Sequence, residues 1–230
     1  MSELYSDFSD AWERFQASTS LRLLVQTLES EWTRGRTDYF AFLISVTDDA
    51  AREYAARTLE ALSGIPGVDP YPERYWHITI KGVGFLAEQV EREDEVTMAD
   101  IERIAEAARP ALESQPAFDV GVGPVNAFDE VVFLEAHDGG ATRALNSLLL
   151  AEVPGLQRYP VDGDTFLPHV SIARFSSDEG LPQLKETLAR LRAEGGRGPR
   201  FTAAEALLIR AHLAREAPTF DLVAEYSLRG

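Results

Sequence analysis

The chain contains the same order of sequence features twice, and this internal duplication limits its fold more than any other property. The first copy runs from an apolar segment at residues 39–46 through an aspartate-rich turn and a helical stretch to a His-x-Thr string at residue 77. The second copy runs from residues 131–136 through a turn and a helical stretch to a His-x-Ser string at residue 169. Corresponding features lie about 90 residues apart, and a further helix is expected after each string. We therefore expect each half to read strand, helix, motif strand, helix.

The two strings place a histidine and a hydroxyl two residues apart between apolar neighbours. They read HITI from His77 and HVSI from His169. Because side chains alternate between the two faces of a β-strand, each imidazole shares a face with its hydroxyl, Thr79 or Ser171, and the aliphatic residues point to the other face. A single string of this kind is typical of an ordinary half-buried strand. Two strings at corresponding places of a duplication favour a functional site shared by the two halves.

The pattern predicts an α+β protein with a bilobal, pseudo-twofold duplicated fold. Mainly antiparallel sheets are expected to line a central cleft, with helices outside them. We assign residues 37–230 to one bilobal domain, with lobes at about 37–115 and 116–230. Helices are expected at residues 98–113 and 181–192, a loop at 64–72, and further strands at 118–122, 206–212 and 220–228.

The segment before the duplication is expected to be helical. Apolar residues between positions 8 and 32 recur at intervals of three and four, which indicates amphipathic helix, and residues 18–20 could cap a second helix there. We assign residues 1–36 to a helical N-terminal extension that packs on the body. Covering the cleft and meeting a partner are the minority interpretations.

Composition excludes several classes of protein. The 230 residues carry a formal net charge of -16, which would repel a long polyanion and argues against an extended nucleic-acid surface. No apolar stretch approaches 18 residues, so no membrane span is expected, and the acidic start of the chain lacks the layout of a secretory signal. We expect a cytoplasmic protein.

The residues available for chemistry favour paired acid and base catalysis. The chain has no cysteine, no Gly-x-Ser-x-Gly elbow and no His-Glu-x-x-His string, so we expect neither a thiol nucleophile, nor a metal, nor a cofactor. An imidazole titrates near pH ~6.5, so one histidine can accept a proton while the other donates one. Displacement at phosphorus needs both roles on opposite sides of the phosphate. Thr79 and Ser171 could then donate hydrogen bonds to the non-bridging oxygens as charge builds there.

Charged and aromatic residues beside the strings are further candidates for binding a substrate. Lys81 continues the alternation of His77 and should share its face, whereas Arg174 falls on the opposite parity from His169 and would have to reach round a strand edge. Either could bind a phosphate. Tyr75 and Phe166 could stack on a base, although packing in the core is the more common role for such residues.

The strings resemble the two motifs of the 2H phosphoesterases, each an H-x-[ST] followed by an apolar residue. The second, FLPHVSIAR at residues 166–174, is closest to the bacterial branch known as 2'-5' RNA ligases or RNA 2',3'-cyclic phosphodiesterases. The resemblance covers about residues 38–230. It implies a bilobal fold, no metal, and opening of 2',3'-cyclic phosphates to 2'-phosphates. It also implies that His77 is the acid and His169 the base, with Thr79 and Ser171 at the phosphate.

Two alternatives to this activity remain open from the sequence. Within the enzyme class, the chain could cleave or join 2'-5' linkages, or process small cyclic nucleotides. In another class, it could be a catalytically weak module that binds a nucleotide or an RNA end, since a motif does not guarantee turnover. A protein that acts through its helical extension is a more remote option. The expected partner is in each enzymatic case a small nucleotide or the 2',3'-cyclic phosphate end of an RNA.

Overall fold

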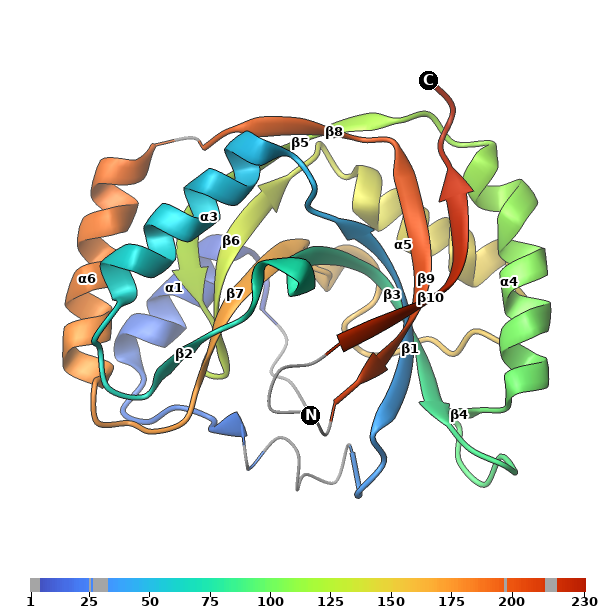
Figure 1. Cartoon of the computed structure of the whole chain (residues 1–230), viewed down its shortest axis with the longest axis horizontal. Helices are drawn as coiled ribbons and strands as arrows, with labels where there is room; N and C mark the ends of the chain where they lie inside the picture. Colours follow the sequence, from blue (N-terminus) through green and yellow to red (C-terminus); the bar gives the residue numbers. More distant parts are fainter. Residues whose placement is uncertain (1–4, 25, 27–32, 197, 214–218) are drawn as a thin grey trace.

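The computed structural model contains one curved sheet of ten strands with helices outside it (Figure 1). The structure describes residues 5–24, 26, 33–196, 198–213 and 219–230. The main path of the sheet runs β10-β9-β1-β3-β7-β6-β5-β8, with the short strands β2 and β4 paired to β7 and β3. Of the strand pairs, β3–β4 is parallel and the others are antiparallel. The α+β fold class predicted from the sequence is confirmed.

The element bounds follow the expected order. The described helices are α1 (Phe8–Ala17), α3 (Asp49–Leu62), α4 (Met98–Glu113), α5 (Ala141–Glu152) and α6 (Leu181–Gly195), with short 3-10 helices η1 (Glu73–Tyr75) and η2 (Gly163–Thr165). The strands are β1 (Asp38–Ser45), β2 (Val68–Pro70), β3 (His77–Leu86), β4 (Glu95–Val96), β5 (Phe118–Ala127), β6 (Val131–His137), β7 (His169–Phe175), β8 (Arg200–Ala203), β9 (Glu205–His212) and β10 (Thr219–Ser227). Residues 64–72, expected as a loop, contain the short strand β2.

The two halves repeat the same four elements, β1-α3-β3-α4 and β6-α5-β7-α6, as predicted. An aspartate at the same place in each half begins the first helix. Asp48 accepts a hydrogen bond from the backbone N–H of Ala51, and Asp138 accepts hydrogen bonds from those of Gly140 and Thr142. Such side chains satisfy N–H groups that have no partner inside the helix. The aspartates therefore explain why both helices begin where the sequence turns.

The sheet interleaves the two halves of the sequence. Strand β5 begins at Phe118, in the second half, and pairs with β6 of that half, whereas β9, which follows α6, returns to pair with β1 of the first half. A boundary near residue 115 therefore divides the repeat in the sequence but does not divide the sheet. The consequence is that each motif strand lies at the centre, where β3 and β7 are neighbours.

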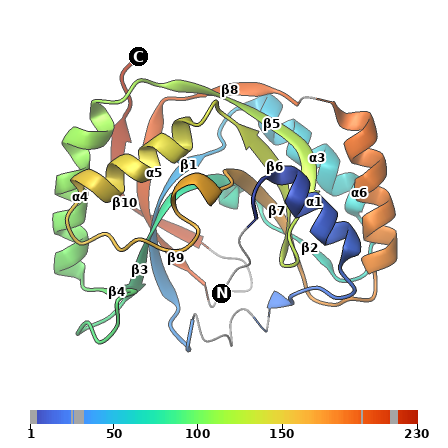
Figure 2. The same cartoon turned by 180° about the vertical axis from the view of Figure 1, so that it is seen from behind.

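One face of the sheet packs against the helices α3 to α6 and forms the main core. Its residues include Phe42, Ile78, Ile80, Leu134 and Ile172, which are buried together with the apolar sides of these helices. We call this the helix-covered face and the opposite one, which carries His77 and His169, the histidine face. Seen from behind, α4 and α5 lie in the left half of the view and α3 and α6 in the right half (Figure 2). No described helix is both long and apolar enough to cross a membrane.

The described part of the N-terminal extension packs on the body, as expected. Helix α1 begins after Asp7, whose carboxylate accepts hydrogen bonds from two backbone N–H groups, and it buries Ala11 and Phe15. The Lys185 side chain of α6 donates to the carbonyl oxygen of Gln16 at 2.8 Å, and α1 contacts β5. The second helix predicted after residues 18–20 falls largely outside the described residues.

Candidate active site

The two histidine strings meet at the centre of the sheet. One antiparallel pair, Ile78 with Val170, joins β3 to β7. Extending this register by one residue on each side sets His77 opposite Ser171 and Thr79 opposite His169. The two histidines are then diagonal neighbours, a relation that separates residues by about 7–8 Å. The predicted assembly of two imidazoles and two hydroxyls on one face thus follows from the strand pairing.

Each imidazole makes an equivalent hydrogen bond to the backbone carbonyl two residues before it. The Nδ1 atom of His77 lies 2.6 Å from the carbonyl oxygen of Tyr75, and that of His169 lies 2.7 Å from the carbonyl oxygen of Leu167. Since a carbonyl only accepts, Nδ1 carries the proton in each ring. Nε2 is therefore the nitrogen that accepts a proton from the neutral ring or donates one from the charged ring.

Burial shifts the titration of both histidines in the same direction. It lowers the pKa of His77 to about 4; the hydrogen bond with Tyr75 raises this pKa by less, and the nearby His169 lowers it further. Burial also lowers the pKa of His169, against a smaller opposite effect of its bond to Leu167. Withdrawal from water disfavours the charged imidazolium. Both rings are thus mainly neutral at neutral pH before an anion binds.

A β-bulge in β3 changes the position expected for Lys81. Thr79 pairs with Leu43 and Lys81 pairs with Phe42, so Ile80 is an extra residue between two consecutive partners on β1. After this extra residue the side chains alternate in the opposite phase, so Lys81 points to the helix-covered face, like its partner Phe42. There its side chain is 0 % exposed and its Nζ lies 2.9 Å from Asp162, whose own side chain is 2 % exposed. The prediction that Lys81 shares the face of His77 is wrong, because it assumed uninterrupted alternation.

A bulge at the corresponding place in β7 brings Arg174 onto the histidine face, whereas the bulge in β3 takes Lys81 away from it. Ser171 pairs with Phe133 and Ala173 with Val132, so Ile172 is the extra residue. Arg174 consequently returns to the histidine face, where it pairs with Val131 on β6 and its guanidinium carbon lies 5.6 Å from the centre of the Tyr71 ring. The expectation that Arg174 lies on the opposite parity is also wrong. The second half therefore places a cation on the face that carries both hydroxyls.

An aromatic stack borders the His77 side of the site. Tyr75 packs edge-on to the His77 ring, with centroids 5.1 Å apart, and is stacked between Tyr71 at 4.6 Å and Phe220 at 4.8 Å. Phe220 also contacts His77 edge-on at 5.1 Å. Tyr75 thus lies beside His77 and is packed between two other rings, and its role in stacking on a base stays a prediction. Phe220 could not be predicted there, because it comes from β10, far along the chain.

A second pair of rings borders His169. Phe128, at the β5–β6 turn, lies edge-on to His169 at 5.2 Å, and the Phe133 ring lies at 5.0 Å. Phe166 ends η2, and its carbonyl oxygen accepts a hydrogen bond from Arg143 Nε at 2.6 Å, which holds the segment that leads into β7. The other two histidines have different partners. His137 pairs with Glu135, and His212 lies between Asp38 and Asp221.

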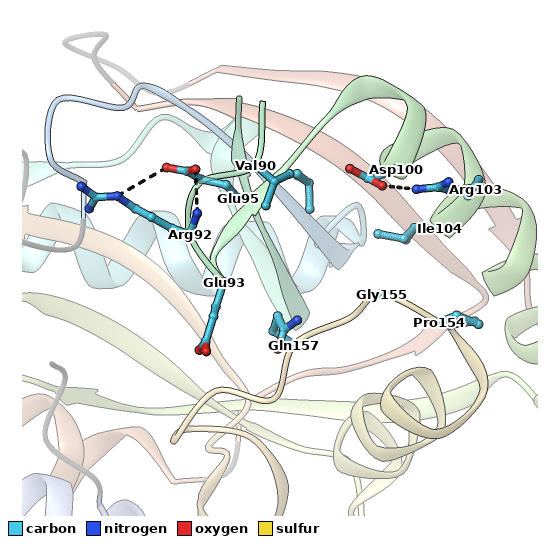
Figure 3. Close-up of a pocket in the computed structure, with 11 residues that line it drawn as sticks. Val90, Arg92, Glu93, Glu95, Asp100, Arg103, Ile104, Pro154, Gly155 and Gln157 are labelled. Carbon is cyan, nitrogen blue, oxygen red and sulfur yellow. Dashed lines mark hydrogen bonds and ion pairs between the residues drawn. The ribbon is translucent and has the colours of Figure 1, made fainter. Parts of the chain in front are cut away.

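The described residues offer no metal-binding cluster, and one cavity that they line lies away from the histidines. Within the described part of the chain, no group of three or more His, Cys, Asp or Glu side chains is placed to hold a metal ion. A cavity of about 230 Å³ lies between the segment at residues 90–96, the start of α4 and the loop after α5 (Figure 3). Glu95 there pairs with Arg92, and Asp100 pairs with Arg103. The histidines do not line this cavity.

The sequence of the chain matches the model of a known protein family. The model of the 2'-5' RNA ligase superfamily matches residues 47–215, which include both histidine strings. The chain belongs to this superfamily. The resemblance to the 2H phosphoesterases is thereby confirmed, and an enzyme of the phosphoesterase and ligase class is what this membership indicates.

Solved structures of other proteins share the fold of this superfamily member. TT0787 of Thermus thermophilus is 18% identical with a TM-score of 0.54, over 84% of this chain and 98% of that one. E. coli LigT in its apo form is 13% identical with a TM-score of 0.59, over 85% and 99%. E. coli LigT complexed with 3'-AMP gives 14% and 0.59 over the same shares. Comparison with curated proteins gives no match.

Proposed function

We propose that the protein hydrolyses 2',3'-cyclic phosphate ends of RNA or of nucleotides to 2'-phosphates, with His77 and His169 as the paired acid and base. The observation that carries this proposal is the doubled, matching geometry. Each half of the fold supplies one imidazole anchored through Nδ1 and one hydroxyl two residues away on the same face. Such a pair supplies both proton transfers that displacement at phosphorus requires.

The reaction proceeds by in-line attack of water on the cyclic phosphate. Nε2 of His169 accepts a proton from the water as its oxygen bonds to phosphorus. The bond between phosphorus and the ribose O3' breaks, and the protonated Nε2 of His77 gives O3' its proton. The products are a 2'-phosphate and a free 3'-hydroxyl. We assign His77 as acid and His169 as base from the order of the family motifs, and the proposal needs no metal.

Three further side chains support the phosphate in this scheme. The hydroxyls of Thr79 and Ser171 donate to the non-bridging oxygens. Extending the Ile78–Val170 pair by one residue on each side would set one hydroxyl opposite each imidazole, which supports this role. Arg174 adds a positive charge on the same face, and an arginine is well suited to a phosphate. Lys81 takes no part, because its ammonium group is buried against Asp162 on the other face.

A small substrate fits the surroundings better than a long polymer. The net charge of -16 opposes an extended polyanion. The stack beside His77 has Tyr75 in its middle, and its partly exposed outer rings, Tyr71 and Phe220, offer aromatic surface to a nucleobase. E. coli LigT, which has the same fold, has been crystallised with 3'-AMP, ATP and NADP+, and these complexes support a nucleotide ligand.

Two other functions use the same residues. Cleavage or joining of 2'-5' linkages passes through the same in-line displacement, with a ribose hydroxyl in place of water, and the name of the superfamily favours this alternative. A nucleotide-binding module would keep the hydroxyls and the arginine but turn substrate over slowly. The three functions differ in the products that they release.

The deciding experiment incubates the protein with 2',3'-cyclic nucleotides and with a short RNA that ends in a cyclic phosphate, in the presence of a chelator. We expect 2'-phosphate products. Cleavage confined to 2'-5' dinucleotides would favour the linkage alternative. Tight binding of a cyclic nucleotide without any product, by protein shown to be folded, would favour the binding module and contradict the proposal.

We expect the pH profile of kcat/KM to have its maximum below pH 6.5. Catalysis needs one imidazole charged and one neutral, and burial holds the pKa of both below the ordinary value of about 6.5. The population with one proton is therefore largest on the acid side and falls as pH rises. Because the phosphate anion raises the pKa of a nearby imidazole, the profile of kcat should lie at higher pH. Steady-state rates between pH 4.5 and 8 test this, and a kcat/KM maximum above pH 7 would contradict it.

A further inference from the structure

The N-terminal extension lies next to the His169 half of the site. The family model begins at residue 47, so this segment is outside the part shared with the superfamily. The ring of Tyr5 nevertheless stacks on that of Phe128, with centroids 4.7 Å apart and planes 22° apart. Phe128 in turn meets the His169 ring edge-on at 5.2 Å. One aromatic ring thus separates the extension from a histidine of the site.

The same arrangement of rings occurs at the other histidine. There Tyr71 stacks on Tyr75 at 4.6 Å and 26°, and Tyr75 meets His77 edge-on at 5.1 Å. The first half supplies both rings from the segment that leads into its own motif strand. In the second half, the corresponding positions are Gly163 and Leu167, which have no rings. The extension and the β5–β6 turn provide the missing stack.

Helix α1 is fixed to the histidine face by a buried polar cluster. The amide Nδ2 of Asn126 donates to the carbonyl oxygen of Phe8 at 2.9 Å and to Glu135 Oε1 at 2.8 Å. Glu135 is 3 % exposed, occupies the register position opposite His169, and also pairs with Arg192 at 2.6 Å. The guanidinium of Arg192 lies over the ring of Trp12 at 5.1 Å. Detaching α1 would open this cluster to water, so the helix is part of the body.

We propose that residues 5–17 form the outer wall of the His169 half-site, and that Tyr5 is a positioning residue which acts through Phe128 to hold the His169 imidazole. The inference rests on the proposed function, since it takes His169 to be catalytic. It replaces the idea that the extension serves a partner protein. Restricting the imidazole matters because a small displacement of a catalytic group costs a large factor in rate.

The ionisable groups around His169 allow the effect of Tyr5 to be isolated. On the elements packed around it these groups include Glu135, opposite His169 on β6, with its partner His137, and His77 on the neighbouring β3. On α1 they include the Arg14–Asp10 pair, in which the guanidinium lies 5.1 Å from the Tyr5 ring centre. A tyrosine is neutral near neutral pH. Replacing Tyr5 therefore removes packing and leaves the formal charge unchanged.

The test compares Tyr5→Ala and Tyr5→Leu with Tyr5→Phe and with Glu13→Ala on the exposed side of α1. We expect kcat for a 2',3'-cyclic nucleotide to fall about tenfold in the first two variants, with KM changed by less than about twofold. Tyr5→Phe should restore the rate because the ring, and not the hydroxyl, makes the stack. Glu13→Ala should match the parent protein, and thermal unfolding of each variant shows that it is folded.

A titration of the imidazoles by NMR gives a readout that does not depend on turnover. The chain has four histidines, so their signals can be assigned by single replacements. In Tyr5→Ala we expect the pKa of His169 to rise toward about 6.5, because water reaches the ring, while that of His77 stays unchanged. An unchanged His169 titration together with an unchanged kcat would overturn the inference. If His169→Ala retained full activity, the proposed function itself would fail, whatever the Tyr5 variants do.

Discussion

Replacing His77 or His169 with alanine is expected to lower the turnover of a 2',3'-cyclic nucleotide by at least about a hundredfold, because in the proposed mechanism each change removes one of the two proton transfers. The loss should appear in kcat, since in the proposed mechanism Thr79, Ser171 and Arg174 would still bind the substrate. Steady-state rates with the products resolved as 2'- or 3'-phosphates measure the effect.

The double replacement should be little worse than either single one. In the proposed mechanism the two imidazoles act as a unit in one step, so the losses from the single replacements should not add. Glu13→Ala on the exposed side of α1 is the control, because this residue lies outside the proposed machinery. Activity that survives both alanine replacements would exclude acid and base catalysis by these residues.

Lys81→Ala is expected to destabilise the fold strongly and to leave catalysis by the folded protein intact. The Lys81 ammonium and the Asp162 carboxylate are both buried, at 2.9 Å. Removing one partner of such a pair leaves an uncompensated buried charge, which costs about 3–5 kcal/mol. For a chain of this size, that loss corresponds to a decrease in Tm of roughly 6–20 °C. Thermal unfolding and kcat measured well below Tm check the two parts of the prediction.

Arg174→Ala should show the opposite pattern, with a fall of about tenfold or more in kcat/KM and a smaller loss of stability, because Arg174 is partly exposed on the histidine face. Replacing Lys81 with Met and Asp162 with Asn together should recover part of the stability, since no unpaired charge is left and the new amide oxygen can still accept a hydrogen bond from Asn146 or from the Tyr159 N–H. A Lys81→Ala protein that is stable but inactive would contradict the placement of Lys81 on the helix-covered face.

Much of the fold and of the site could be predicted from local sequence. The period of two along a strand is enough to place His77 with Thr79 and His169 with Ser171, because each pair spans only three residues. The repeated order of elements then predicts two matching half-sites. Helix α4 was expected from the sequence at residues 98–113, where a capping box between Thr97 and Asp100 begins it.

The faces of Lys81 and Arg174 could not be predicted in the same way. A bulge is a property of two paired strands, since it depends on which residues the neighbouring strand sets opposite the extra one. Ile80 and Ile172 do not differ in the sequence from the other aliphatic residues of their strands. The prediction of a strict alternation therefore failed two residues beyond each hydroxyl.

The aromatic surroundings of the site were decided by tertiary structure alone. Phe220 reaches His77 from the last strand, and Tyr5 reaches Phe128 from the start of the chain. Neither contact leaves a local signal, because the residues that meet are far apart in sequence. The sequence by itself determined the doubled motif, the alternation of elements and the chemistry that two imidazoles and two hydroxyls can perform, since these follow from short-range periodicity. Which cation lies on the histidine face, and which rings contact each histidine, depended on strand register and long-range packing.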